Sequence, residues 1–274
     1  MELTGHHRKN SAIFYFCCFS ISYGWLFFNG LLLHQLKPVF FLNRLDLSLN
    51  VLFLTGISKA VIKNYYLQLI LDILYFILPL LLVFAINTKK QFSLAIINSF
   101  FNLIYALLLS SFSVLSIEGF AGWILLPLLF IYKTDKGFYY ALHSMRYIFL
   151  LIYFSAGLWK IRAGGIFNTE QMSAILLKQH AAYITQAPAD WFSRCINYLV
   201  IHYKLSYLLY LFSTIAELFF LIGFFTKKYD KLLMMIFLLF VLFNLFLMRI
   251  NYFSWIAFLG CLWYAKYNEP NHEK

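Results

Sequence analysis

The sequence predicts an all-α protein, a polytopic bundle of about eight transmembrane helices with an additional interfacial or re-entrant segment. Of its 274 residues, 62% are hydrophobic and only 12% are charged, whereas soluble domains carry about 25% charged residues. The mean hydropathy is +0.75. Several apolar runs approach the roughly 20 residues that a helix needs to cross a bilayer. We therefore expect residues 1–274 to form a single integral membrane domain.

Four spans are expected in the first half of the chain. The run at 12–34 is longer than the apolar core of a signal peptide and has no small-residue cleavage site, so it is interpreted as a retained first span. The segment 45–60 is too short to cross and is interpreted as interfacial or re-entrant. Proline interrupts two of the spans, as Pro79 and Pro127. The four expected spans are 12–34, 65–87, 91–116 and 119–132.

Four more spans are expected in the second half, at 138–159, 205–225, 231–248 and 251–267. The polar stretch 161–204 is interpreted as an outward-facing loop with a short helix from Ser173 to His180. A second short helix follows, for which Asp190 is the expected N-cap. The segment 268–274 is polar and is expected to be a disordered tail.

The net charge of +11 would suggest nucleic acid as a partner of a soluble protein. Here the basic residues are spread over many loops, so they are interpreted as fixing orientation in a lipid bilayer, and no nucleic acid partner is expected. The short loops with Lys89 and Lys90, with Lys133, and with Lys227 fall on one side of an eight-span bundle. The positive-inside rule then predicts an inner-membrane protein with both termini in the cytoplasm.

The four cysteines form no C-x-x-C pair, so the sequence indicates neither a metal site nor a disulfide framework. Ionisable residues inside spans are costly and usually face the bundle interior or a water-filled cavity. The candidates, inside spans or at their ends, are Asp72, His143, Arg146, Lys160, Glu217 and Arg249. They are the residues from which a functional site is sought.

Glu217 lies well inside the span 205–225, where an isolated carboxylate would need a cationic partner. Lys160 and Arg162 are at a suitable depth if the spans 138–159 and 205–225 pack together. Two interpretations stay open. The pair could fix the helix bundle, or Glu217 could position a lysine that acts as a base, with Arg162 lowering its proton affinity. Lys160 alone could also be an interfacial anchor.

The sequence YFSAGLWK at 153–160 resembles the signature of the vitamin K-dependent γ-carboxylase-like membrane superfamily, also called the horizontally transferred transmembrane (HTTM) domain. The acidic Glu217 ahead of a Leu/Phe run and the segment 249–255 are similar to later parts of the family pattern. The chain is close in size to small bacterial members, which include a protein needed to mature a secreted sporulation-delaying toxin peptide.

This resemblance implies a catalytic role for Lys160, because the matching lysine of the carboxylase is the proposed base acting on vitamin K hydroquinone. It also implies a quinol such as a vitamin K or a menaquinol as cofactor, and an exported peptide as a substrate. The sequence departs from the carboxylase in having no histidine in the spans 91–116 and 119–132, and no segment matching the carboxylase's long lumenal domain. The resemblance therefore leaves the reaction open.

Two functions follow from the sequence. The first is a membrane enzyme or maturation factor with Lys160 as base, Glu217 as its positioning residue and Arg162 as a tuning cation. The second is a non-catalytic membrane chaperone, immunity protein or transporter-like scaffold, in which the same residues stabilise the bundle. Replacing Lys160 by arginine separates them, since arginine keeps the charge but cannot act as a base near neutral pH.

Overall fold

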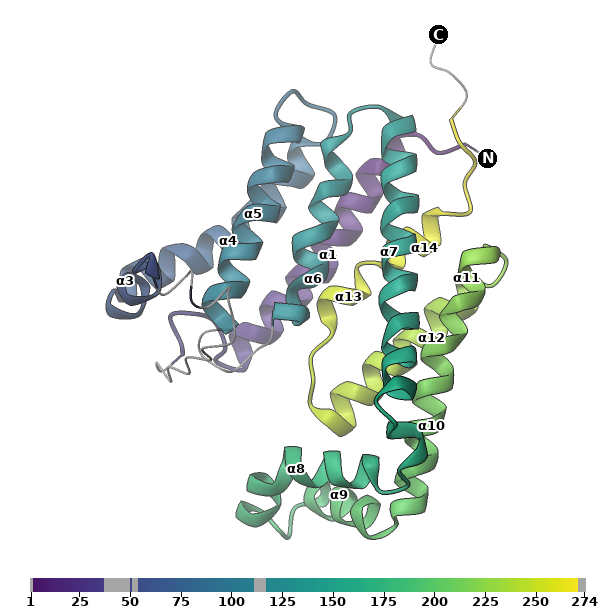
Figure 1. Ribbon diagram of the computed structural model, residues 1–274. Helices are drawn as coiled ribbons and strands as arrows, with labels where there is room; N and C mark the ends of the chain where they lie inside the picture. Colours follow the sequence, from purple (N-terminus) through teal and green to yellow (C-terminus); the bar gives the residue numbers. More distant parts are fainter. Residues whose placement is uncertain (1, 37–49, 51–53, 111–116, 271–274) are drawn as a thin grey trace. The chain divides into compact units, whose positions relative to one another are not determined.

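The computed structural model describes residues 2–36, 50, 54–110 and 117–270. Within these ranges the regular structure is helical, apart from a β-bridge between Glu2 and Asn268. The chain forms two compact units. Unit 1 is Met1–Arg146 with Phe253–Lys274, and unit 2 is Tyr147–Tyr252, so the boundary falls inside the long helix α7 (Figure 1).

Within the described ranges, 6 helices are long and apolar enough to cross a membrane. The predicted all-α class is confirmed for the described residues, and the 6 helices are consistent with a multi-pass integral membrane protein, whereas the predicted eight spans and the re-entrant segment are not confirmed. The 6 helices are α1 (Gly5–Phe28), α4 (Tyr65–Ala85), α5 (Gln91–Ser110), α7 (Asp135–Arg162), α10 with its continuation (Tyr203–Phe225) and α12 with its continuation (Asp230–Met248).

The other two predicted spans, 119–132 and 251–267, are not long continuous helices. The first is divided into η1 (Ile117–Phe120), α6 (Ala121–Leu125) and η2 (Leu126–Ile131), and the second into α13 (Phe253–Ile256) and α14 (Leu259–Tyr264). Pro127 falls at the start of η2, where a proline cannot donate the hydrogen bond that an α-helix needs. The two broken segments contact each other, since a Cβ on Gly122 would overlap the carbonyl of Ser254.

Polar side chains of α5 satisfy the backbone of the first broken segment. Asn102, fully buried, donates to the carbonyl of Trp123 at 2.8 Å, and the Ser99 hydroxyl donates to the carbonyl of Ile124 at 2.6 Å. Backbone that leaves the α-helix inside a membrane is tolerated only where protein satisfies its polar groups. The buried polar face of α5 is therefore what permits the short helices.

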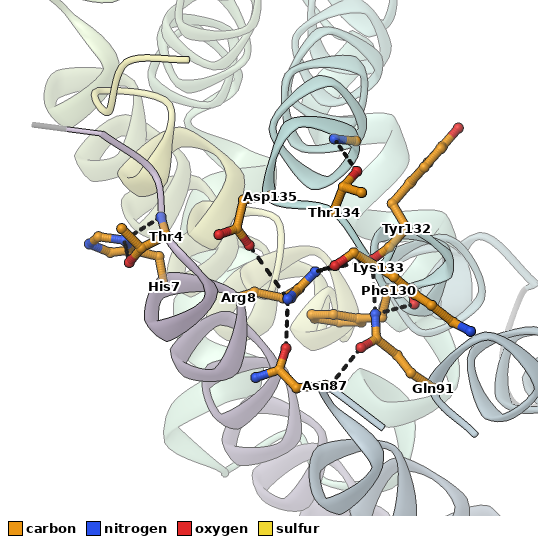
Figure 2. A network of polar contacts seen from close by, with 11 residues as sticks. Thr4, His7, Arg8, Asn87, Gln91, Phe130, Tyr132, Lys133, Thr134 and Asp135 are labelled. Carbon is orange, nitrogen blue, oxygen red and sulfur yellow. Dashed lines mark hydrogen bonds and ion pairs between the residues drawn. The ribbon is translucent and has the colours of Figure 1, made fainter. Parts of the chain in front are cut away.

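Figure 2 shows a polar network at one end of unit 1. The Arg8 guanidinium donates to the Asn87 side chain at 2.6 Å, lies 3.5 Å from the Asp135 carboxylate and donates to the carbonyl of Lys133. Gln91 donates to the carbonyl of Tyr132 at 2.9 Å. The same end of unit 1 therefore contains the start of α1, the α4–α5 turn and the start of α7. The loop charges predicted that the first two lysine-rich loops lie on one side.

Unit 2 contains the second part of α7, α8 (Gln171–Gln186), α9 (Trp191–Ile201), α10 (Tyr203–Leu218), η4 (Phe219–Leu221), α11 (Ile222–Phe225), α12 (Asp230–Phe243) and the π-helix η5 (Asn244–Met248). Figure 1 shows α8 and α9 lying crosswise to α10 and α12. Both helices were predicted within 161–204, and Asp190 caps α9 by accepting from the backbone N–H of Phe192 at 3.1 Å.

Two predicted segments are described only in part. Of 45–60, positions 45–49 and 51–53 lie outside the described residues, and the described positions include the start of α3 (Ile57–Lys63), so the interfacial or re-entrant segment stays a prediction. Of the tail 268–274, the described part is not free: the carbonyl of Asn268 accepts from Leu3, and Glu269 lies 3.2 Å from Lys136.

Candidate functional site

Lys160 lies in the last turn of α7 and points to α10. Its ammonium nitrogen donates to Glu217 Oε1 at 2.8 Å and to the Ser213 hydroxyl at 3.0 Å. The same nitrogen lies 5.3 Å from the centre of the Tyr210 ring, within the range of a cation–π contact. The pairing of Lys160 with Glu217 that the sequence predicted is therefore present.

One face of α10 supplies all three partners. Tyr210, Ser213 and Glu217 are spaced three and four residues apart, which places them one above another on a helix. Glu217 is 97% removed from solvent, since its exposed fraction is 3%, and the Lys160 side chain keeps 24% of its surface. The buried carboxylate thus holds an amine whose outer side remains accessible.

Gly157 lets α10 approach α7 at this point. A Cβ added at Gly157 would lie 3.0 Å from a methyl carbon of Leu218 and 3.2 Å from Cβ of Glu217. Both distances are shorter than an ordinary van der Waals contact. The glycine of the YFSAGLWK segment is therefore explained by packing, because it brings the backbone of α7 close to the residue that pairs with Lys160.

The turn that follows α7 is also attached to α10. Gly164 has a φ of +75° in the left-handed region, where glycine is favoured, and a Cβ on Gly165 would meet the Tyr210 hydroxyl. The Tyr207 hydroxyl donates to the carbonyl of Ile166 at 2.5 Å. Two tyrosines of α10 thus hold this turn beside the lysine.

Two hydrogen-bonding positions at the pair are open among the described residues. Glu217 Oε2 is buried and has no hydrogen-bond partner there. An ammonium group has three N–H donors, and the described contacts of Lys160 with oxygen use two of them. A buried polar atom without a partner costs free energy. One donor and one acceptor are therefore available for a ligand or a water molecule.

Arg162, predicted to tune Lys160, lies apart from this pair in the contacts that the structure shows. Its guanidinium carbon is 5.3 Å from the Trp159 ring, and both side chains are exposed. A charge in contact with water is screened from its neighbours. Arginine and tryptophan at the end of a span are typical of the membrane interface, and the tuning role of Arg162 stays a prediction.

The remaining ionisable residues of the spans lie elsewhere. Arg146 is buried with 1% of its surface exposed, and the His143 ring packs edge-on against Tyr139 at 4.3 Å. Arg249 has its guanidinium over the rings of Tyr183 and Phe192, at 4.3 and 4.0 Å. None of these described contacts involves Lys160.

Sequence reasoning missed Ser213 and Tyr210 as neighbours of Lys160. Their spacing from Glu217 on one helical face was the signal that could have identified them. A pocket in unit 1 is lined by residues that include Ser11, Leu126 and Cys261, and it contains neither Lys160 nor Glu217. The predicted outward-facing cleft at Lys160 stays a prediction.

Comparison of the chain with models of protein families, with characterised proteins and with solved structures finds no match.

Proposed function

We propose that the chain is an integral membrane enzyme or maturation factor in which Lys160 acts as a general base, Glu217 orients it and Ser213 supports it. The observation that carries this proposal is the 2.8 Å contact between the Lys160 amine and a buried carboxylate with one oxygen left unpartnered. A hydrogen bond from a bound ligand would offset the cost of burying that second oxygen.

The geometry supports base chemistry in a specific way. In a site of low dielectric, an ion pair can become a neutral pair if one proton moves along its hydrogen bond, because burial disfavours the charged forms. Transfer from the Lys160 ammonium to Glu217 would leave a neutral amine whose electron pair faces the new Glu217 O–H. Rotation about the Cε–Nζ bond would turn that pair to the open position, where it would accept a proton from a substrate hydroxyl.

The substrate class is taken from the resemblance to the HTTM and γ-carboxylase-like proteins. A quinol-like lipid would reach the pair from the bilayer, and an exported peptide would reach it from the aqueous side at the end of α7. We propose the inner membrane as its location, with both termini in the cytoplasm. The gathering of Arg8 and the lysine-rich loops at one end of unit 1 supports this orientation.

Oxygen uptake by the purified protein, supplied with a reduced naphthoquinone in vesicles, tests the base role. We expect Lys160→Arg to lower the rate by at least about 100-fold, because a positioned base contributes roughly 10²–10⁴-fold and arginine cannot take this role. Glu217→Gln should retain an intermediate rate. Wild-type activity in Lys160→Arg would rule out a base, and no quinol-dependent uptake by the wild type would exclude a quinol substrate.

The second candidate is a non-catalytic scaffold, which the close packing at Gly157 favours. In that case Lys160→Arg and wild type would have the same melting temperature and the same bound molecules. Mass spectrometry of lipids and peptides that copurify with the detergent-solubilised protein distinguishes the two. A quinone that copurifies with wild type but not with Glu217→Gln supports the enzyme. A peptide that copurifies equally with wild type and with Glu217→Gln supports the scaffold.

A further inference from the structure

A second group of ionisable side chains lies in unit 1, around Asp72 of α4. This carboxylate is 1% exposed and accepts four hydrogen bonds. Oδ2 accepts from the backbone N–H of His34 at 3.0 Å and lies 2.5 Å from its ring nitrogen Nδ1. Oδ1 accepts from the backbone N–H of Leu33 at 3.1 Å and from the Tyr105 hydroxyl at 2.5 Å.

These contacts determine which ring nitrogen of His34 carries a proton. Every described contact of Asp72 is one in which the carboxylate accepts, so Nδ1 of His34 must donate. Nε2 then holds the free electron pair, and the described contacts give it no partner. The His34 side chain is 17% exposed. The arrangement is a carboxylate–imidazole pair whose reactive nitrogen faces away from the buried acid, the geometry of a general base.

Capping of the turn at Leu33 and His34 does not account for the whole group. The two backbone N–H contacts would hold that turn without an imidazole or a tyrosine. Tyr105 of α5 also holds the carboxylate by its hydrogen bond. This tyrosine is 1% exposed and stacks on Tyr75, with the ring centres 3.8 Å apart. Side chains from α4 and α5 therefore fix one histidine ring, which is what orientation of a base requires.

The surroundings of His34 indicate what it would bind. Its ring lies 6.1 Å from that of Tyr65, which is 55% exposed, and the neighbouring Tyr66 is 74% exposed. At the end of α1, Phe28 is 86% exposed. Exposed aromatic residues at the ends of apolar helices are typical of the bilayer interface, and they offer faces on which a planar ring can stack.

We propose that His34, oriented by Asp72 and Tyr105, forms a second proton-accepting site that binds a phenol-like head group at the membrane interface. Imidazole is a base of moderate strength, which suits a phenolic hydroxyl better than an aliphatic alcohol. The phenolic O–H bond breaks and its proton bonds to Nε2. The product is a phenolate beside an imidazolium that still donates from Nδ1 to Asp72. No electron is transferred.

An alkyl-substituted 4-nitrophenol in detergent micelles is a direct probe, because its phenolate absorbs visible light. We expect wild-type protein to increase the phenolate fraction several-fold at near-neutral pH. His34→Asn retains an N–H close to Nδ1 for Asp72 but has no atom at Nε2, so it should remove the increase while the protein stays folded. His202→Asn, at an exposed histidine of unit 2, is the matched control and should leave it unchanged.

Two results of the phenolate measurement would overturn the proposal. One is an undiminished phenolate signal in His34→Asn. The other is loss of the signal in Lys160→Met, which would assign the phenol to the amine of unit 2. Acylation by diethyl pyrocarbonate is a second measurement. The wild-type His34 ring should react and the phenol should protect it, and Tyr105→Phe should lower the acylation rate. A ring that never reacts has no accessible Nε2, which also excludes the site.

Discussion

His180 shows how a single residue couples local structure to pH. It is 5% exposed on α8, and its Nε2 donates to the carbonyl of Leu247 at 2.8 Å in the π-helix η5. Gln179 donates to the next carbonyl, that of Met248. Leu247 and Met248 are the last two residues of η5, where carbonyls have no helical partners, so two adjacent side chains of α8 supply them.

Burial lowers the pKa of His180 below its ordinary value of 6.5, and the charge of Arg249 lowers it further, against the opposing effect of the Leu247 hydrogen bond. The unfolded chain therefore takes up the proton first on acidification. The buried, neutral His180 therefore contributes to the stability of the folded protein above about pH 6.5. That contribution is lost as the pH falls towards the lower pKa of His180 in the folded protein. We expect the melting temperature to fall between about pH 7.5 and 5.5.

Melting curves of wild type and His180→Gln across this range check the prediction. Glutamine retains an N–H for the Leu247 carbonyl but does not titrate. The variant should therefore lose less stability than wild type on acidification. Parallel curves for the two proteins would contradict the assignment to His180.

At the scale of elements, the contact between α7 and α10 depends on Gly157. Gly157→Ala should lower the free energy of unfolding by about 1–3 kcal/mol, the usual cost of overpacking, and should lengthen the contact between Lys160 and Glu217. Thermal unfolding in detergent measures the first effect. Gly24→Ala is the matched control, since a Cβ there meets nothing within 4 Å, and it should be neutral or stabilising.

The double variant Gly157→Ala with Leu218→Ala identifies the cause. Leu218 contributes the atoms nearest to the new Cβ, so its truncation should recover part of the activity that Gly157→Ala loses. If the double variant is no more active than Gly157→Ala, the close approach of the two helices is not what positions Lys160.

The broken segments 119–132 and 251–267 show where pattern-based prediction of elements fails. Hydropathy detects apolar runs but not whether their backbone is continuous. Part of the sequence signal for the break in 119–132 lay in another helix, α5. There Asn98 and Asn102 share a face and form a hydrogen bond at 3.0 Å. The Asn102 amide donates to the backbone carbonyl of Trp123, 21 positions further along the chain, and such a long-range partnership has no local sequence signature.

The pairing of Lys160 with Glu217 could be predicted because burying a lone carboxylate is expensive enough to require a cation. The proton-accepting group at His34 could not be predicted from the sequence. Asp72 was identified as costly in its span, but its partner His34 is the last residue of the expected span 12–34, and a histidine at the end of a span needs no buried partner. The residues that supply the hydrogen bonds of Asp72 come from two other segments, the turn at 33–34 and α5, and only the fold brings them together.

At the scale of the whole molecule, the positive-inside rule gives a direct test of orientation. In a background without native cysteines, Thr88→Cys in the α4–α5 turn should be protected from a membrane-impermeant maleimide in intact cells. Asn168→Cys, in the turn after α7, should be labelled. Permeabilised cells provide the control, since both positions should then react. Labelling of position 88 in intact cells would reverse the proposed orientation.

The hydrogen bond from the backbone N–H of Leu3 to the carbonyl of Asn268, at 3.1 Å, has a practical consequence. It holds the first and last described segments of unit 1 side by side. Protein domains inserted next to Leu3 and next to Asn268 would therefore lie close together. A short linker could join these two positions and allow the chain to be opened at an exposed turn instead, so that circular permutation would preserve every described helix.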